Sequence, residues 1–248
     1  MKKFTLPESN VFAYGVHFPE IDTLAISDIH FGFERALYKE GVSLPSQYED
    51  VARLTDAMLD KTKASRLLIN GDVKHEFGSA SQQEWFEVNA FLDHCKERGV
   101  EIVMVRGNHD NYILNVLKGR DQKVFDNFSD DGFLFLHGHQ MPEKGAKWDV
   151  LVMGHEHPAV SISDRAGVRH KFRCVMIGEW KNKPLIVLPA LSMYAAGVDF
   201  SEPRKSWWSG EHHEFLSPIL QECDVPEFTP IVVDEEGGVK KFPKLKLL

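Results

Sequence analysis

Cysteine is scarce in this sequence, and its three residues stand far apart. Cys95, Cys174 and Cys223 are odd in number and form no Cys-x-x-Cys pair. A disulfide framework and a thiolate zinc site are therefore not expected, and a reducing cytoplasm is the expected compartment. No apolar run approaches the ~20 residues of a membrane span, and Pro7 and Glu8 interrupt any such run at the start. We expect no membrane partner.

An excess of positive charge is absent as well. The formal net charge is −8 at pH 7. Coating nucleic acid through a broad basic field needs clustered Lys and Arg, so that function class is not expected. Binding of nucleic acid in a local groove is kept as an alternative. A chain of 248 residues with 43% hydrophobic content suits a single domain over residues 1–248.

Short apolar runs alternate with amphipathic segments, which favours a layered α/β fold. Strands are predicted at residues 22–27, 66–70, 101–105, 133–136 and 150–153. Helices are predicted over 46–63 and 81–99, the second beginning with Ser81 and Glu84 in capping-box spacing. Further strands after residue 157 predict a second sheet, at 160–163, 169–180 and 184–190 and in a hairpin over 228–242 that turns at Gly237 and Gly238.

Residues of metal-ligand chemistry follow each of the five early strands. In chain order they are Asp28 and His30, Asp72, Asn108 and His109, His137 and His139, and His155 and His157. The carboxyl ends of strands in α/β folds form the crevice where ligands bind, so these loops should converge. His155 and His157 are two residues apart and so face one space on an extended backbone. If these residues were unrelated surface residues, the same residue types would have to follow five strands by chance. One shared site is therefore favoured.

The ligand types indicate two metal ions. Carboxylate, imidazole and one amide suit Mn²⁺, Fe²⁺, Zn²⁺ or Co²⁺, and Mn²⁺ is the ion expected first. There are too many ligands for one ion. Two ions ~3.5–4 Å apart that share a carboxylate accommodate them, and this arrangement serves hydrolysis at phosphorus. Glycine beside the ligands allows sharp turns and close approach of the backbone.

The motifs also resemble a known family. The series Asp-Ile-His, Gly-Asp, Gly-Asn-His-Asp, His and Gly-His-Glu-His, in this order over residues 28–157, resembles the calcineurin-like metallophosphoesterase superfamily. The stretches "SDIHFGFERALYKEGVSLP", "GDVKHEF", "LPA" and "LSPIL" resemble its ICC-like branch, which comprises archaeal SbcD-related phosphoesterases and bacterial ligase-associated phosphodiesterases. The resemblance implies a four-layer α/β/β/α sandwich of the metallophosphoesterase type.

The resemblance also implies roles for the ligands. Asp28, His30 and His157 would hold the first ion, Asn108, His137 and His155 the second, and Asp72 would bridge them. A hydroxide between the ions would be the nucleophile, because the metals lower its pKa.

The same resemblance implies roles for His109 and Asp110, and other neighbouring residues are candidates by their position. His109 would protonate the leaving oxygen or stabilise phosphate charge, with Asp110 orienting its ring. Arg106 could contact a phosphate oxygen or be a solvated charge. His75 could line the substrate side or make a structural hydrogen bond. His139 could support a ligand or only complete a turn.

The expected function is hydrolysis of a nucleotide-derived or nucleic-acid-end phosphodiester. Related double-strand-break nucleases carry a large capping domain and extensions after the last motif, whereas ninety-one residues follow His157 here, so a break-processing complex is not expected. The alternatives are a phosphomonoesterase acting on nucleotides or phosphoproteins, and a non-catalytic metal-binding scaffold. The intact His109 tells against the scaffold. Trp207 and Trp208 could stack a base or serve in packing.

Overall fold

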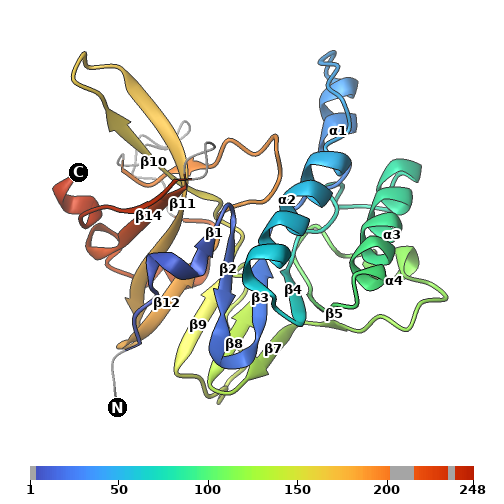
Figure 1. Ribbon diagram of the computed structural model, residues 1–248, viewed down its shortest axis with the longest axis horizontal. Helices are drawn as coiled ribbons and strands as arrows, with labels where there is room; N and C mark the ends of the chain where they lie inside the picture. The colour runs from blue at the N-terminus through green and yellow to red at the C-terminus, as the bar shows by residue number, and fades with distance from the viewer. Residues whose placement is uncertain (1–3, 202–214, 234–237) are drawn as a thin grey trace.

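Two β-sheets pack face to face, with helices on the outside (Figure 1). The computed structural model describes residues 4–201, 215–233 and 238–248. The first sheet has the strand order β1 (Val11–Phe12), β2 (Gly15–Phe18), β3 (Thr23–Ile26), β4 (Arg66–Asn70), β5 (Glu101–Val105) and β6 (Val124–Phe125). Strands β1 to β3 pair antiparallel, and β3 to β6 pair parallel.

Within the residues that the structure describes, the second sheet has nine strands. Along its main path the order is β13 (Val198–Asp199), β10 (Pro158–Ser163), β11 (Arg169–Trp180), β12 (Lys183–Val187), β9 (Val150–Met153), β8 (Phe133–Leu136) and β7 (Asn127–Asp130). Strand β14 (Thr229–Val233) pairs with β11 and with β15 (Val239–Lys241). Strands β8, β9 and β12 are mutually parallel, so β8 and β9 point their carboxyl ends the same way.

The helices are short apart from two. The α-helices are α1 (Phe33–Lys39), α2 (Tyr48–Thr62), α3 (Gln82–Glu97), α4 (Ile113–Val116) and α5 (Pro218–Gln221); the 3₁₀ helices are η1 (Glu8–Asn10), η2 (Pro19–Ile21), η3 (Val225–Glu227) and η4 (Leu245–Leu247). Helices α2 and α3 lie along the first sheet, on the side away from the second sheet (Figure 1). The predicted capping box is present, because the Ser81 hydroxyl accepts from the Glu84 amide and the Glu84 carboxylate accepts from the Ser81 amide. Within the described ranges, no helix combines the length and apolar character that crossing a membrane requires.

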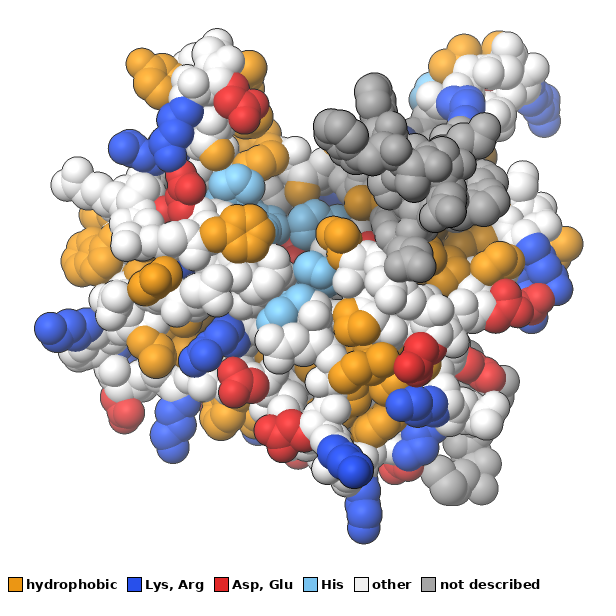
Figure 2. All heavy atoms as spheres, turned by 180° about the vertical axis from the view of Figure 1, so that it is seen from behind, with side chains coloured by type: hydrophobic (Ala, Val, Ile, Leu, Met, Phe, Trp, Pro, Cys, Tyr) orange, Lys and Arg blue, Asp and Glu red, His pale blue; other side chains and the backbone are white. Residues whose placement is uncertain are grey.

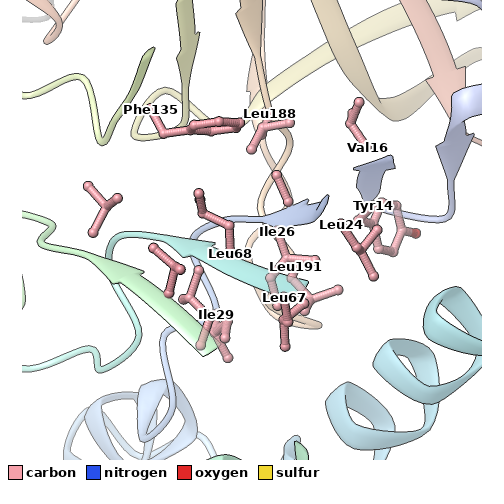
Figure 3. Packing of buried hydrophobic residues seen from close by; sticks show 14 of the residues in the cluster. Tyr14, Val16, Leu24, Ile26, Ile29, Leu67, Leu68, Phe135, Leu188 and Leu191 are labelled. Atoms are coloured by element: carbon pink, nitrogen blue, oxygen red, sulfur yellow. The ribbon is translucent and has the colours of Figure 1, made fainter. Parts of the chain in front are cut away.

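Strand β8 shows how the layers are held. Phe133 and Phe135 belong to the hydrophobic cluster between the sheets, whereas Leu134 and Leu136 belong to the cluster on the other face, which includes residues of α5. A strand with both faces buried reads as a continuous apolar run, as "FLFL" does. In Figure 3, Phe135 and Leu188 lie across the intersheet space from Leu68. The predicted α/β/β/α layering is confirmed.

The strand predictions hold, but the division between the sheets differs. All five early strands form, yet β8 and β9 belong to the second sheet, which begins at β7 and not after residue 157. The reason lies in pairing: β6 occupies the edge of β5, and β9 pairs with β12 through Leu151 and Leu185. Helix α1 has no counterpart among the predicted helices. The expectation of one domain over residues 1–248 stays a prediction.

Replacing Phe135 with Ala should destabilise the sandwich strongly. Its side chain is fully buried and meets Phe18 edge to face at 5.5 Å between ring centroids. Truncating such a ring costs about 3–5 kcal/mol of unfolding free energy. Urea unfolding measures this, with Phe86→Ala as the control, because Phe86 is 65% exposed and its loss should change stability by no more than about 0.5 kcal/mol. Similar midpoints for the two variants would contradict the assigned intersheet core.

Candidate metal centre

The seven predicted ligands lie at one edge of the sandwich, where strands of both sheets end. Those of the first sheet follow β3, β4 and β5, and those of the second follow β8 and β9. Asn70, the last residue of β4, crosses between the sheets, because its side-chain amide donates to the Leu136 carbonyl at 3.1 Å. The backbone amide of Gly154 donates to the His137 carbonyl at 2.9 Å. The first bond fixes the loop ends of the two sheets relative to each other, and the second joins the two ligand loops of the second sheet.

The first ligand group consists of Asp28, His30 and His157, whose ligand atoms lie within 4.8 Å of one another. Nε2 of His157 is 3.0 Å from Oδ1 of Asp28 and 3.3 Å from Nε2 of His30. Oδ1 of Asp28 is buried, whereas Oδ2 accepts from the His155 amide at 3.0 Å. One carboxylate oxygen is thus held by the backbone, and the other faces two imidazoles.

The second ligand group consists of Asp72, His137 and His155, with Asn108 beside it. Nε2 of His137 is 3.2 Å from Oδ2 of Asp72 and 3.1 Å from Oδ1 of Asn108. Oδ2 of Asp72 is also 3.9 Å from Nε2 of His30, so this carboxylate faces both groups. The arrangement is the one expected of a bridging Asp72, which stays a proposal.

Backbone conformation sets the predicted ligands apart. Asp28, His30, Asp72, His155 and His157 have φ between 46° and 71°, in the left-handed region that non-glycine residues seldom adopt. These five are among only eleven non-glycine residues of the described ranges with positive φ. Such strain persists where surrounding structure enforces it and concentrates at functional sites. The clustering therefore indicates that the loops serve a site.

The charges of the site call for a cation between the carboxylates. Burial alone would raise the pKa of Asp28, but His157 and His137 outweigh it and lower that pKa. Burial would lower the pKa of His137, yet Asp72 and Asp28 raise it to about 10. In the protein without ions, a protonated His137 is thus the countercharge for two buried carboxylates, a place that a divalent ion can take.

The remaining histidines are suited to bind metal. Burial lowers the pKa of His30 to about 3 and that of His155 to about 4, so both rings are neutral near pH 7 and carry a free lone pair. His137 has its Nδ1 2.9 Å from the Asn70 carbonyl, which directs Nε2 toward the ligands. Mixed oxygen and nitrogen donors fit Mn²⁺, Fe²⁺, Zn²⁺ and Co²⁺. The residues present therefore fit two divalent ions.

A cavity of about 520 Å³ opens onto both ligand groups. Its lining includes His30, Asp72 and His109, together with apolar Phe77 and Leu216. Figure 2 shows histidine side chains gathered in a hollow of one face, beside hydrophobic side chains. The hollow is large enough to admit a phosphoester together with part of its organic group.

His109 lies at the wall of this cavity, and its orientation differs in one respect from expectation. Nδ1 of its ring is bonded to the His75 carbonyl, and Nε2 lies 3.9 Å from Oδ2 of Asp72. Asp110, expected to orient the ring, instead accepts from the backbone amides of Gly107 at 2.9 Å and Val73 at 3.2 Å. Asp110 is 1% exposed, and its two bonds join the loops on either side of His109. The ring of His109 is oriented by the His75 carbonyl instead.

The other predicted residues are distributed around the site. The ring of His75 packs against His109 at 5.5 Å between centroids. Arg106 lies outside the 520 Å³ cavity, with Nη1 3.6 Å from Oδ1 of Asp126, and lines a neighbouring hollow of about 360 Å³. His139 lines that second hollow, its ring 5.5 Å from that of His137. The pair Trp207 and Trp208 lies outside the described residues.

Lys74 is a residue of the site that sequence reasoning missed. Its side chain is fully buried, and Nζ donates to the carbonyls of His109, Glu76 and Gly78. Burial lowers its pKa. The ammonium thereby ties the loop after β4 to the loop after β5. The only signal in the sequence is a lysine inside the "GDVKHEF" motif, and nothing there indicates burial.

Comparisons with known proteins identify a family and several similar structures. The family profile described as calcineurin-like phosphoesterase matches residues 21–172, more than half of the chain. Pseudomonas putida nuclease MPE is similar in structure, with a TM-score of 0.55 and 21% identity over 75% of this chain and 82% of that one. YfcE, a phosphoesterase from E. coli, gives a TM-score of 0.42 and 17% identity over 90% and 98%. Entamoeba histolytica Vps29 complexed with zinc gives a TM-score of 0.35 and 14% identity over 89% of this chain and 97% of that one. No curated protein matches the sequence.

Gly107 offers a test of the metal centre, because a Cβ at this position would overlap Oδ1 and the backbone nitrogen of Asp72. Gly107→Ala should displace Asp72 and weaken ion binding about 10–100-fold, as loss of a supporting contact typically does. Metal analysis after dialysis measures this. Gly78→Ala is the control, since open space surrounds that position. Equal retention of two Mn²⁺ ions by both variants would remove Asp72 from the ligand set.

Proposed function

Because this chain belongs to the calcineurin-like phosphoesterase family and is a metal-dependent phosphoesterase, we propose that it is a phosphodiesterase that uses two divalent ions, with Mn²⁺ as the first candidate. The first ligand group would hold one ion and the second ligand group, with Asn108, the other. Asp72 would bridge them. When bound, the ions supply positive charge and lower the pKa of water at the site.

The lining of the 520 Å³ cavity is the observation that favours a diester. A monoester brings up to two negative charges and nothing beyond the phosphorus, whereas a diester brings one charge and a second organic arm. Among the described residues, no Lys or Arg lines the cavity, and Phe77, Val198 and Leu216 give it apolar walls. Apolar walls suit an organic arm better than they suit a second charge.

We propose that the substrate is nucleotide-derived or the end of a nucleic acid. The resemblance to the ICC-like branch favours this class. Phe77 is 56% exposed and lines the cavity, so its ring offers a surface on which a base can stack. His75 and Arg106 would act on the substrate side, Arg106 from the neighbouring hollow.

His109 is proposed as the general acid. Its Nδ1 is engaged by the His75 carbonyl, and the Phe77 ring stacks on it at 3.7 Å between centroids, so Nε2 is the nitrogen left to give a proton to the leaving oxygen. Lys74 donates to the His109 carbonyl, and Asp110 accepts from the backbone amide of Gly107 in the same loop. The His75 carbonyl and the Phe77 ring therefore fix the ring, and Lys74 fixes its backbone, before a substrate arrives.

The substrate class can be tested with chromogenic esters. With Mn²⁺ present, bis-p-nitrophenyl phosphate should be cleaved with a higher kcat/KM than p-nitrophenyl phosphate, because the apolar walls accept the second arm. Chelator-treated protein is the control and should be inactive. Faster cleavage of the monoester would replace the proposal with a phosphomonoesterase. Two bound ions with no ester hydrolysed would favour a metal-binding scaffold.

His109→Ala should keep its ions and lose turnover. The expected deficit is ~10²–10⁴ for leaving groups that need a proton and smaller for p-nitrophenolate. Rates across diesters of increasing leaving-group pKa measure the contrast. His94→Ala is the matched control, because His94 lies on α3 and pairs with Asp56 at 2.9 Å. An equal loss for all leaving groups would mean that His109 stabilises phosphate charge instead of donating a proton.

A further inference from the structure

Three imidazoles form a cluster beside the two ligand groups. One ring nitrogen from each of His30, His75 and His109 lies within 4.8 Å of those of the other two. The ring centroids are 4.9 Å apart for His30 and His109, 5.4 Å for His30 and His75, and 5.5 Å for His75 and His109. With Zn–N bonds of ~2.0–2.1 Å, a tetrahedral zinc ion holds imidazole centroids about 5 Å apart. The three rings already have this spacing.

The hydrogen bonds of these rings leave nitrogens available for an ion. Nδ1 of His30 and Nδ1 of His75 are buried and make no hydrogen bond. Nδ1 of His109 is bonded to the His75 carbonyl, which leaves Nε2 as the nitrogen that can bind an ion. A metal-bound histidine commonly donates its other ring N–H to a carbonyl in this way.

We propose that His30, His75 and His109 bind a third ion, of the class of Zn²⁺, that inhibits the enzyme. All three donors are nitrogens, whereas each of the other two groups includes a carboxylate. Imidazole nitrogen favours Zn²⁺ over Mn²⁺, which suits oxygen donors better. Zinc should therefore fill this third site under conditions in which manganese fills only the first two.

His30 belongs both to the first ligand group and to the cluster of three imidazoles, and it can bind one ion through each of its two ring nitrogens. Nε2 faces Asp28 and His157 at 4.0 Å and 3.3 Å, which leaves Nδ1 for the third ion. Binding an ion at each nitrogen releases the remaining ring proton to solvent. His30 and His109 both line the 520 Å³ cavity, so two of the three rings lie at its wall.

Inhibition follows from the position of His109 and rests on the proposed function. A zinc ion on Nε2 of His109 occupies the nitrogen that is to give a proton to the leaving oxygen. It would also place positive charge and a bound water where the organic arm is to lie. The Mn²⁺-loaded enzyme should thus lose activity as zinc is added, without loss of its first two ions.

The test counts bound zinc on the full chain by equilibrium dialysis and metal analysis, so it does not depend on turnover. Dialysed against zinc alone, the wild-type chain should bind three Zn²⁺ ions. Dialysed against manganese alone, it should bind two Mn²⁺ ions. His75→Ala removes one donor but keeps the backbone carbonyl that accepts from His109, and it should bind two Zn²⁺ ions. His75→Gln, which keeps a polar side chain, should also bind two. His170→Ala is the control and should bind three, because His170 is half exposed on β11 and contacts Asp164.

Two zinc ions on the wild-type chain, or three on both His75 variants, would overturn the third site. Circular dichroism establishes that each variant is folded before its ions are counted. Zinc inhibition of the Mn²⁺-loaded wild type should weaken in the His75 variants when each is compared with its own zinc-free rate. A wild-type chain that binds three zinc ions and hydrolyses no phosphoester would keep the site and refute the phosphodiesterase proposal.

Discussion

The charge of two buried carboxylates, Asp28 and Asp72, is the constraint on which the metal centre depends. Asp28 is fully buried and Asp72 is 2% exposed, so water screens neither. A buried carboxylate is tolerated when hydrogen bonds or cations compensate the lost hydration. Each has one oxygen bonded to a backbone amide, from His155 and His109 respectively, and the other directed at imidazoles. The remaining negative charge is what two divalent ions would neutralise.

The packing of the two sheets sets the spacing of these charges. The first ligand group takes Asp28 and His30 from the first sheet and His157 from the second. The second ligand group takes Asp72 from the first sheet and both of its histidines from the second. A shift of one sheet against the other would change distances within both groups, so the buried cluster around Phe135 also fixes the spacing of the two ligand groups. Ions that bind only this arrangement would in turn stabilise the association of the sheets.

The sequence allowed the strands and ligand types to be predicted, because each depends on local information. Apolar runs such as "FLFL" mark buried strands, and a polar residue directly after a run marks its carboxyl end. The assignment of β8 and β9 to the second sheet depends on long-range pairing with β12, which no local pattern encodes. The contacts of Lys74 and Asp110 were not predictable for a related reason. Both are charged residues whose partners are backbone groups of loops, and backbone groups leave no mark in a sequence.

The left-handed backbone of the ligands bears on how ions bind. The loop after β3 and the loop after β4 continue to pair beyond their strands, because the Asp28 amide donates to the Gly71 carbonyl at 3.1 Å and the His30 amide to the Asp72 carbonyl at 2.9 Å. These bonds hold Asp28, His30 and Asp72 in conformations that an isolated loop would seldom adopt. Folding of the sheet therefore offsets the free-energy cost of these backbone conformations, and binding of the ion does not have to offset it. A site organised in this way loses little binding free energy to reordering, so the donor atoms themselves decide which ion is preferred.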